Sequence, residues 1–160
     1  MNENDSEHIA GVLLGSGAVR AVRPEDADVV IVNTCAVRQK SEEKLYSYLG
    51  RLSLLKKKRP FVLGLAGCVA QVRKTDLLEK WPSVDFVVGP DGYLDLVEIV
   101  ERAAEAPEVR TELGPDWREI GAAATARENP WSAFVPVMEG CDNFCAYCIV
   151  PFSRGREKFR

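Results

Sequence analysis

Residues 29–35 read Val-Val-Ile-Val-Asn-Thr-Cys, and residues 61–68 read Phe-Val-Leu-Gly-Leu-Ala-Gly-Cys. Both stretches are continuous apolar runs that lead into a cysteine. Runs without polar alternation are typical of strands that are buried on both faces, as in a parallel sheet. The two stretches therefore predict neighbouring parallel strands. They place Cys35 and Cys68 close together at the carboxyl edge of that sheet, where such folds hold their sites.

Helical patterns lie around these strands. The apolar spacing predicts a third strand over residues 84–88 and helices over 5–14, 37–57, 70–80 and 93–104. Asp5 and Ser6 are predicted to cap the first helix, and Gly15 and Gly17 to end it. The alternation predicts the α/β class, with an open parallel sheet, helices on both faces and right-handed crossovers. Because the order begins with a helix, we expect that a first strand is missing before Met1.

Three segments are expected along the chain. Residues 1–105 form an N-terminal α/β domain, residues 106–130 a linker, and residues 131–160 the beginning of a second domain. The linker prediction depends on weak periodicity, an alanine-rich patch and five residues that favour turns: Pro107, Gly114, Pro115, Gly121 and Pro130. A new strand is predicted over 133–138, although Pro136 interrupts it.

The composition is that of an ordinary globular protein. The chain has 160 residues, 46% of them hydrophobic, and a formal charge of −3. These values exclude disordered and collagen-like classes and give no overall attraction to nucleic acid. No apolar run approaches the roughly 18 residues of a membrane helix, and the N-terminus lacks the order of a signal peptide. We therefore expect a cytoplasmic protein without membrane association, in which five cysteines favour metal or redox chemistry over disulfides.

Three of the cysteines, Cys141, Cys145 and Cys148, form a CxxxCxxC cluster. Closely spaced thiols on one loop can bind one metal centre, and three thiolates on a [4Fe–4S] cluster leave one iron open to a small molecule. A zinc site is the alternative, but structural zinc needs four ligands. The other candidates for that fourth ligand are Cys35, Cys68 and the single histidine, His8. Three free or buried thiols without metal are the remaining interpretation.

Residues 139–157 read Glu-Gly-Cys-Asp-Asn-Phe-Cys-Ala-Tyr-Cys-Ile-Val-Pro-Phe-Ser-Arg-Gly-Arg-Glu. This stretch closely resembles the cluster loop of radical S-adenosylmethionine (SAM) methylthiotransferases. The resemblance implies that the three cysteines hold a [4Fe–4S] cluster that cleaves SAM reductively, at the start of a radical SAM β/α barrel. It also implies that Tyr147 lies near the bound SAM, and Arg154-Gly155-Arg156 is a further signature of the family.

Two upstream motifs, Asn33-Thr-Cys-Ala-Val-Arg38 and Gly67-Cys-Val-Ala-Gln71, resemble the second and third cysteine motifs of that family's N-terminal domain. The resemblance implies that Cys35 and Cys68 hold an auxiliary [4Fe–4S] cluster linked to sulfur donation. The family's first cysteine, in a Gly-Cys-Gln-Met-Asn context, has its counterpart just before Met1. We therefore expect the auxiliary site to lack its third ligand, and two ordinary buried cysteines are the alternative.

The same motifs resemble most closely the branch that methylthiolates C2 of N6-isopentenyl-adenosine beside the anticodon of tRNA. Other branches act on threonylcarbamoyl-adenosine or on a ribosomal-protein aspartate. A non-catalytic zinc or RNA-binding module and a metal-free interaction scaffold are the alternatives from other classes. The resemblance implies a monomeric full-length enzyme with two [4Fe–4S] clusters, SAM, tRNA and an electron donor such as flavodoxin. Because so few residues follow Pro130, we expect a chain that is truncated at both ends and inactive alone.

Two basic stretches are weaker signals. Residues 56–59, Lys-Lys-Lys-Arg, predict a solvated helix end where cations oppose the helix dipole, with contact to RNA phosphates as the alternative. The tail over 154–160 carries four basic residues. It would flank the cluster in a complete barrel, and a disordered end is the other expectation.

Overall fold

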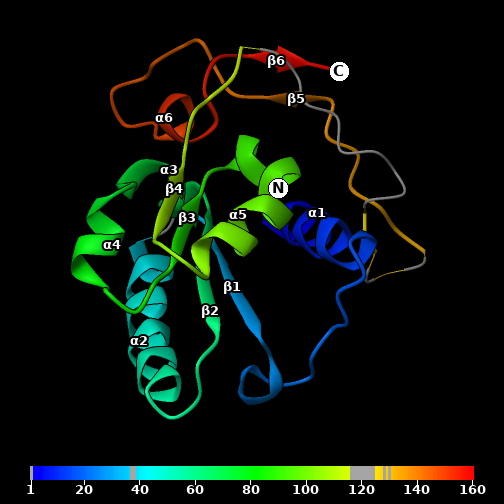
Figure 1. The fold of residues 1–160 in the computed structure, drawn as a ribbon. Coiled ribbons are helices and arrows are strands. Elements are labelled where there is room, and N and C mark those ends of the chain that lie inside the picture. Colours follow the sequence, from blue (N-terminus) through cyan, green and yellow to red (C-terminus); the bar gives the residue numbers. More distant parts are fainter. Residues whose placement is uncertain (1, 37–38, 116–124, 128, 130) are drawn as a thin grey trace.

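The computed structural model describes residues 2–36, 39–115, 125–127, 129 and 131–160 (Figure 1). Its centre is a parallel sheet in the order β1-β2-β3-β4. The strands are β1 (Val29–Thr34), β2 (Val62–Gly67), β3 (Phe86–Val88) and β4 (Glu108–Arg110). A separate antiparallel pair lies near the C-terminus and consists of β5 (Met138–Glu139) and β6 (Lys158–Phe159). The prediction of an open parallel sheet is confirmed.

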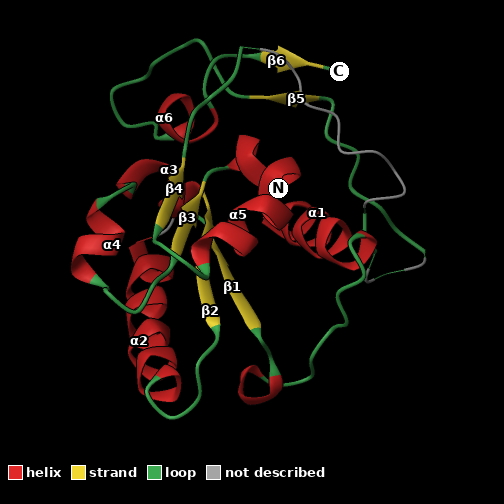
Figure 2. Cartoon of the chain, in the orientation of Figure 1, coloured by secondary structure: helices red, strands yellow, loops and turns green. Residues whose placement is uncertain are grey.

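Helices flank the sheet and connect its strands (Figure 2). The α-helices are α1 (Asn2–Gly15), α2 (Gln39–Lys56), α3 (Cys68–Arg73), α4 (Asp76–Lys80), α5 (Leu96–Ala103) and α6 (Val150–Arg154). Two short 3-10 helices are η1 (Pro24–Asp26) and η2 (Pro90–Asp95). Within the described ranges, no helix has the length and apolar character needed to cross a bilayer.

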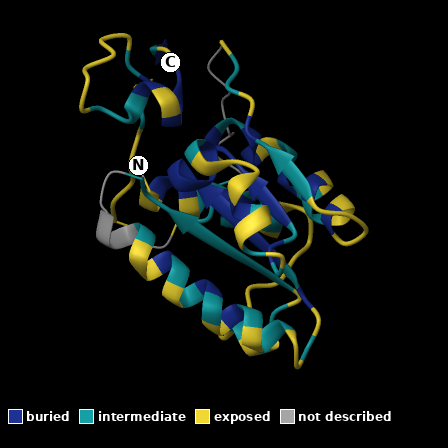
Figure 3. Cartoon of the chain, turned by 90° about the vertical axis from the view of Figure 1, so that its left-hand side faces the viewer, coloured by how far each residue is buried: buried dark blue, intermediate teal, exposed yellow. Residues whose placement is uncertain are grey.

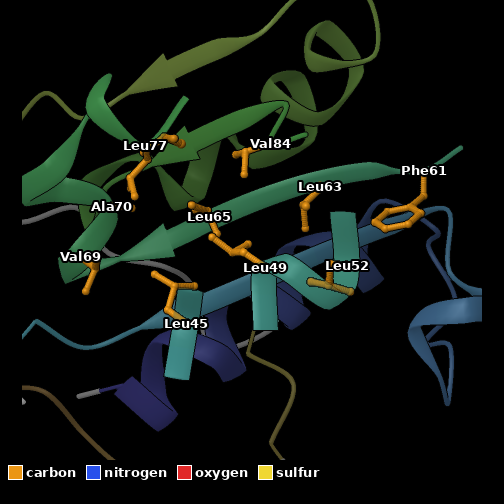
Figure 4. Close-up of a cluster of buried hydrophobic side chains, with 11 residues drawn as sticks. Leu45, Leu49, Leu52, Phe61, Leu63, Leu65, Val69, Ala70, Leu77 and Val84 are labelled. Atoms are coloured by element: carbon orange, nitrogen blue, oxygen red, sulfur yellow. The ribbon is translucent and has the colours of Figure 1, made fainter. Parts of the chain in front are cut away.

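One face of the sheet packs against α2, α3 and α4. Leu45, Leu49 and Leu52 recur at helical spacing along α2 and are almost completely buried. Figure 4 shows these side chains beside Leu63 and Leu65 of β2. The leucine spacing in the sequence thus identifies the side of α2 that contacts the sheet.

The opposite face packs against α1 and α5. Ile9 of α1 and Leu96 and Ile99 of α5 form a cluster with Phe86 and Val88 of β3, and all five residues are buried. Figure 3 shows that buried residues concentrate at the centre of the molecule, in agreement with the burial of β2 and β3, and that the outward sides of the helices are exposed. The prediction of helices on both faces is therefore confirmed.

The crossover connections between the parallel strands differ in handedness. α2 joins β1 to β2, and α3 with α4 joins β2 to β3, on one face of the sheet. α5 joins β3 to β4 on the other face, although the strand order continues in the same direction. The expectation of right-handed crossovers throughout is therefore wrong for this sheet. The position of α5 allows it to cover, together with α1, the apolar face of β3.

β1 is an edge strand and is not buried on both faces as its sequence predicts. All six of its residues are partly exposed, because among the described residues β2 is its one neighbour in the sheet. Its apolar side chains, including Val30, Ile31 and Val32, contact the helical layers of both faces. A continuous apolar run therefore did not distinguish an edge strand covered by helices from a central strand.

Several predicted helices have different boundaries in the structure. α1 begins at Asn2, so Asp5 and Ser6 lie inside the helix and do not cap it. It ends at Gly15, as predicted. The helix expected over 70–80 is divided into α3 and α4 at Lys74, whose φ of 47° cannot continue a right-handed helix. The helix expected over 93–104 begins earlier, as η2, and continues as α5.

The linker and the new strand are predicted only in part. Residues 108–110 lie within the predicted linker, yet they form β4 and pair with β3. Residues 116–124, with the alanine-rich patch, and also Met1, Arg38 and Pro130, lie outside the described residues. The strand expected over 133–138 is reduced to β5, because Pro136 has no N–H to donate to a ladder.

Both basic stretches have more contacts than expected. The tail begins with the last residue of α6 and contains β6, and Arg154 and Lys158 are buried, so the expectation of a disordered end is wrong. In the stretch over 56–59, Lys56 pairs with Asp85, and Arg59 pairs with Asp28 at 2.6 Å. The two central lysines of that stretch are exposed, as a solvated helix end predicts.

Candidate metal centre

The sheet brings Cys35 and Cys68 to the same edge. β1 and β2 pair with a constant offset, from Val29 opposite Val62 to Thr34 opposite Gly67. Cys35 directly follows β1, and Cys68 directly follows β2 as the first residue of α3, so both residues lie at the carboxyl ends of neighbouring parallel strands. The two strands end at one edge, as predicted; that the two thiols come close together there and bind metal stays a prediction.

The end of β2 requires a glycine just before the second of these cysteines. Gly67 has a φ of 93°, and a Cβ there would lie 2.3 Å from Oδ1 of Asn33. The amide of Asn33 donates through Nδ2 to the backbone oxygen of Asn2 at 3.0 Å and to Oγ of Ser6 at 2.9 Å. These contacts hold the first turn of α1 at the edge that carries the cysteines.

The CxxxCxxC loop connects β5 to α6 and begins with a close backbone approach. Gly140 has a φ of 79°, and a Cβ there would lie 1.9 Å from the backbone oxygen of Arg156. The N–H of Cys141 donates to the backbone oxygen of Gly155 at 3.1 Å. The first cysteine of the loop is therefore fixed to the segment that directly follows α6.

The three thiols of the loop are free and accessible. Cys145 is exposed, and Cys141 and Cys148 are partly buried. The N–H of Cys148 donates to the backbone oxygen of Cys145 at 2.9 Å, which turns the chain between these two residues. Tyr147 is 92% exposed, so its ring is open to a ligand.

The donor set fits an iron–sulfur cluster in its chemistry. Free thiols are the soft ligands that such clusters take, and three of them lie within residues 141–148. In the described part of the chain, no three Cys, His, Asp or Glu side chains already lie together as a metal site. The three thiol groups would therefore turn toward one another when they bind a cluster.

Arg154 connects the end of α6 to the N-terminal domain. Its Nη1 donates to Oδ1 of Asp5 at 3.2 Å, and its Nη2 donates to Oδ2, so the pair is bidentate. Both side chains are almost completely buried. Burial alone would lower the pKa of Arg154, but the carboxylate of Asp5 outweighs it and raises the pKa above its ordinary value. The guanidinium therefore stays charged inside the protein.

Other titratable groups surround this ion pair. Oε1 of Glu139 lies 3.7 Å from Nη1 of Arg154. Burial raises the pKa of Glu139, and the charge of Arg154 opposes that shift. Burial also raises the pKa of Tyr93 well above its ordinary value, and the carboxylate of Asp5 adds to the shift. The hydroxyl of Tyr93 has no hydrogen-bond partner among the described residues.

A second buried ion pair lies beside the first. Nζ of Lys158 in β6 is 2.6 Å from Oδ2 of Asp91 in η2, and the lysine side chain is 2% exposed. The same carboxylate oxygen accepts the N–H of Gly114 at 2.8 Å. α6 also packs on α3, which begins at Cys68. These contacts hold residues 138–160 on the carboxyl edge of the sheet (Figure 1).

Sequence reasoning did not identify Asp5 and Asp91 as part of this site. Carboxylates in the first turn of a helix are usually assigned to capping or to the helix dipole, and Asp5 received that interpretation. One signal was available, because Asp5 and the buried Ile9 are four residues apart and so share the inward face of α1. A charged residue on an apolar helix face predicts a buried partner.

His8 lies in α1, and it belongs to no group of three Cys, His, Asp or Glu side chains among the described residues. The backbone oxygen of its neighbour Glu7 accepts the N–H of Ala126, and the Glu7 carboxylate pairs with Arg127 at 3.4 Å. Burial lowers the pKa of His8 below its ordinary value of 6.5; Asp5 and Glu7 oppose the shift and Arg127 adds to it. The histidine is therefore more neutral in the folded chain than in the unfolded chain.

We expect the imidazole of His8 to titrate below pH 6.5. Because the folded state binds fewer protons there than the unfolded state, the free energy of unfolding should decrease as the pH falls through the range just below 6.5. A His8→Gln variant should lose this part of the pH dependence. The chain has a single histidine, so one imidazole NMR signal followed against pH measures the pKa directly. A midpoint at or above 6.5 would contradict the burial of this side chain.

The chain is similar to known proteins. Residues 1–89 match the uncharacterized protein family UPF0004. Proteins named tRNA-2-methylthio-N(6)-dimethylallyladenosine synthase are similar to the whole chain. The one from Thermotoga petrophila is 47% identical over 163 residues, covering 100% of this chain and 36% of the relative. Relatives from Geobacter sulfurreducens and Dictyoglomus thermophilum are 48% and 42% identical, covering 98% and 100% of this chain and 36% and 37% of their own lengths. The chain thus spans little more than a third of these curated relatives.

Proposed function

The chain belongs to the uncharacterized protein family UPF0004, and from this premise we propose that it contributes the N-terminal part of a radical SAM tRNA methylthiotransferase. The proposed reaction adds a methylthio group to C2 of N6-isopentenyl-adenosine beside the anticodon. The proposed substrate class is inferred from the names of the relatives, which are similar to the chain along its whole length. The observation that carries the proposal is the presence of the free CxxxCxxC thiols on a segment held at the same sheet edge as Cys35 and Cys68.

The residues have separate roles in this proposal. Cys141, Cys145 and Cys148 would hold a [4Fe–4S] cluster in residues 131–160, at the start of a radical SAM barrel, and Tyr147 would contact SAM. Cys35 and Cys68 would supply ligands to an auxiliary cluster in residues 1–105, with residues 106–130 between the two parts. When bound, such a cluster with SAM supplies one-electron chemistry.

The chain's own contribution is to orient the cysteine loop. The close approach of Gly140 to Arg156 and the hydrogen bond from Cys141 to Gly155 fix the base of the loop. The ion pairs of Arg154 and Lys158 hold the loop's flanks on the N-terminal sheet. The proposed partners of the whole enzyme are tRNA and a one-electron donor such as flavodoxin, and the enzyme would act as a monomer in the cytoplasm.

Deletion of the gene that encodes this chain tests the proposal. We expect bulk tRNA from the deletion strain to lose the 2-methylthio form of isopentenyl-adenosine and to accumulate the nucleoside without it. A gene for the complete enzyme should restore the modification, whereas the same gene carrying Cys141→Ala, or one that encodes residues 1–160 alone, should not. Digestion of tRNA to nucleosides and mass spectrometry measure both forms.

Two other results would redirect the assignment. Loss of the methylthio group from threonylcarbamoyl-adenosine or from a ribosomal-protein aspartate would move the chain to another branch. Unchanged modification at all three targets would contradict the methylthiotransferase proposal and would favour a non-catalytic metal-binding or RNA-binding module.

A further inference from the structure

The geometry points to Arg154 as a positioning residue that fixes the CxxxCxxC loop on the sheet edge that carries Cys35 and Cys68. The benefit to catalysis rests on the proposed function, but the contact itself does not depend on it. This contact would keep together two cysteine groups that are far apart in the sequence.

The ion pair between Arg154 and Asp5 has a defined geometry. Arg154 stands at the end of α6, shortly after the last cysteine of the loop, and Asp5 stands in α1. The guanidinium meets both oxygens of the carboxylate. A bidentate pair fixes orientation as well as distance, because the planar fork of arginine matches a carboxylate in one arrangement.

Both side chains of this ion pair are buried. The side chains of Arg154 and Asp5 are 3% and 4% exposed. Each charge is strongly unfavourable in such surroundings without the other. The nearby Glu139 is itself half-buried and farther from the guanidinium, so it does not replace Asp5. The two segments are therefore held together as long as the pair is intact, and loss of either charge favours their separation.

Contacts made by Gly155 and by α6 connect Arg154 to the cysteines. The backbone oxygen of Gly155, the next residue, accepts the N–H of Cys141 at 3.1 Å. The position of Arg154 therefore determines the position of the first loop cysteine through a single intervening residue. On the other side, α6 packs on α3, whose first residue is Cys68. Arg154 thus lies between the two cysteine groups.

The positioning role of Arg154 is distinct from a general role in folding, because α6 lies outside the apolar cores of the sheet. The buried apolar clusters on both faces of the sheet are formed by residues of α1 to α5 and the strands they cover, and none of their members comes from α6. Loss of the ion pair should therefore loosen α6 against α3 and leave the sheet intact, while Lys158 still pairs with Asp91. Cys68, which is 7% exposed, would then become accessible.

The experiment measures the alkylation rate of each cysteine in the metal-free chain of 160 residues. The chain is treated with iodoacetamide after removal of metal by a chelator, and peptide mass spectrometry follows each thiol separately. We expect Arg154→Met and Asp5→Asn each to accelerate alkylation of Cys68 on the order of tenfold, as expected when a local opening exposes a buried group. Loss of a nearby cation by itself would slow a thiol, so an increase reports uncovering.

Two further variants make the result specific. Because both substitutions break the same contact, the double variant should be little faster than either single variant, and Arg154→Lys, which keeps the charge but not the fork, should lie between wild type and Arg154→Met. Lys56→Met breaks the ion pair with Asp85, which involves neither α6 nor the loop, and should leave the rate at Cys68 unchanged.

Three outcomes would overturn the inference: an unchanged rate in both single variants, additive effects in the double variant, or an equal increase in Lys56→Met. Far-UV circular dichroism monitors the fold of each variant. If Arg154→Met does not fold, Arg154→Lys and Asp5→Asn decide the question. The readout involves neither iron nor tRNA, so failure of the proposed enzyme function would leave it standing.

Discussion

A chain in which Cys141, Cys145 and Cys148 are all replaced by alanine should bind almost none of the iron that the unaltered chain takes up during anaerobic reconstitution. The three thiols are free, accessible and close in sequence. A [4Fe–4S] cluster on this loop would give about four iron atoms per unaltered chain. Iron and acid-labile sulfide counted per chain, together with the brown absorbance of the cluster, measure the effect. It is expected to be nearly complete, because the substitution removes every thiolate of the loop.

The matched control replaces the two thiols of the sheet edge, with Cys35→Ser and Cys68→Ser in one chain. This control should keep the iron of the loop, because neither residue lies in residues 141–148. Iron that persists in the triple variant and disappears in the control would assign the cluster to the sheet edge instead. A colourless chain that takes up zinc would support the structural zinc module.

The strands and the place of the cysteines could be predicted because local signals determine them. Continuous apolar runs identified β1 and β2, and the rule that parallel strands end at one edge then placed Cys35 and Cys68 together. The leucine spacing of α2 was equally local. In each case a few neighbouring residues carry the information, so no knowledge of distant contacts was needed.

The contacts that hold the C-terminal segment could not be predicted in the same way. Asp5 and Arg154 lie near opposite ends of the chain, and no local pattern pairs a helix carboxylate with a distant guanidinium. The same reason explains the missed strand β4, a three-residue edge strand that forms because β3 is available as a neighbour. It also explains β1, whose place at the edge depends on the order of the whole sheet.

A fully buried phenylalanine ring fills the centre of the core on the second face of the sheet, and we expect Phe86→Ala to destabilise the chain by about 3–5 kcal/mol. Phe86 is fully buried in the cluster formed by α1, α5 and the sheet. Its ring lies directly over Gly64 of the neighbouring strand β2, where an added Cβ would be 2.0 Å from the ring carbon Cζ. Urea unfolding followed by circular dichroism measures the loss of stability.

The contact between Phe86 and Gly64 predicts that the effect of a second substitution depends on the ring. In the unaltered chain, Gly64→Ala should cost about 1–3 kcal/mol, because the new methyl group forces the ring to move. In the Phe86→Ala chain the ring is gone, so the same Gly64→Ala should be neutral or should stabilise the chain by about 0.5–1 kcal/mol through the lower flexibility of alanine. Leu49→Ala, on the other face of the sheet, supplies the control background, in which Gly64→Ala should keep its full cost. An equal cost of Gly64→Ala in all three backgrounds would contradict the packing of the ring on the glycine, since only direct contact makes the two sites non-additive.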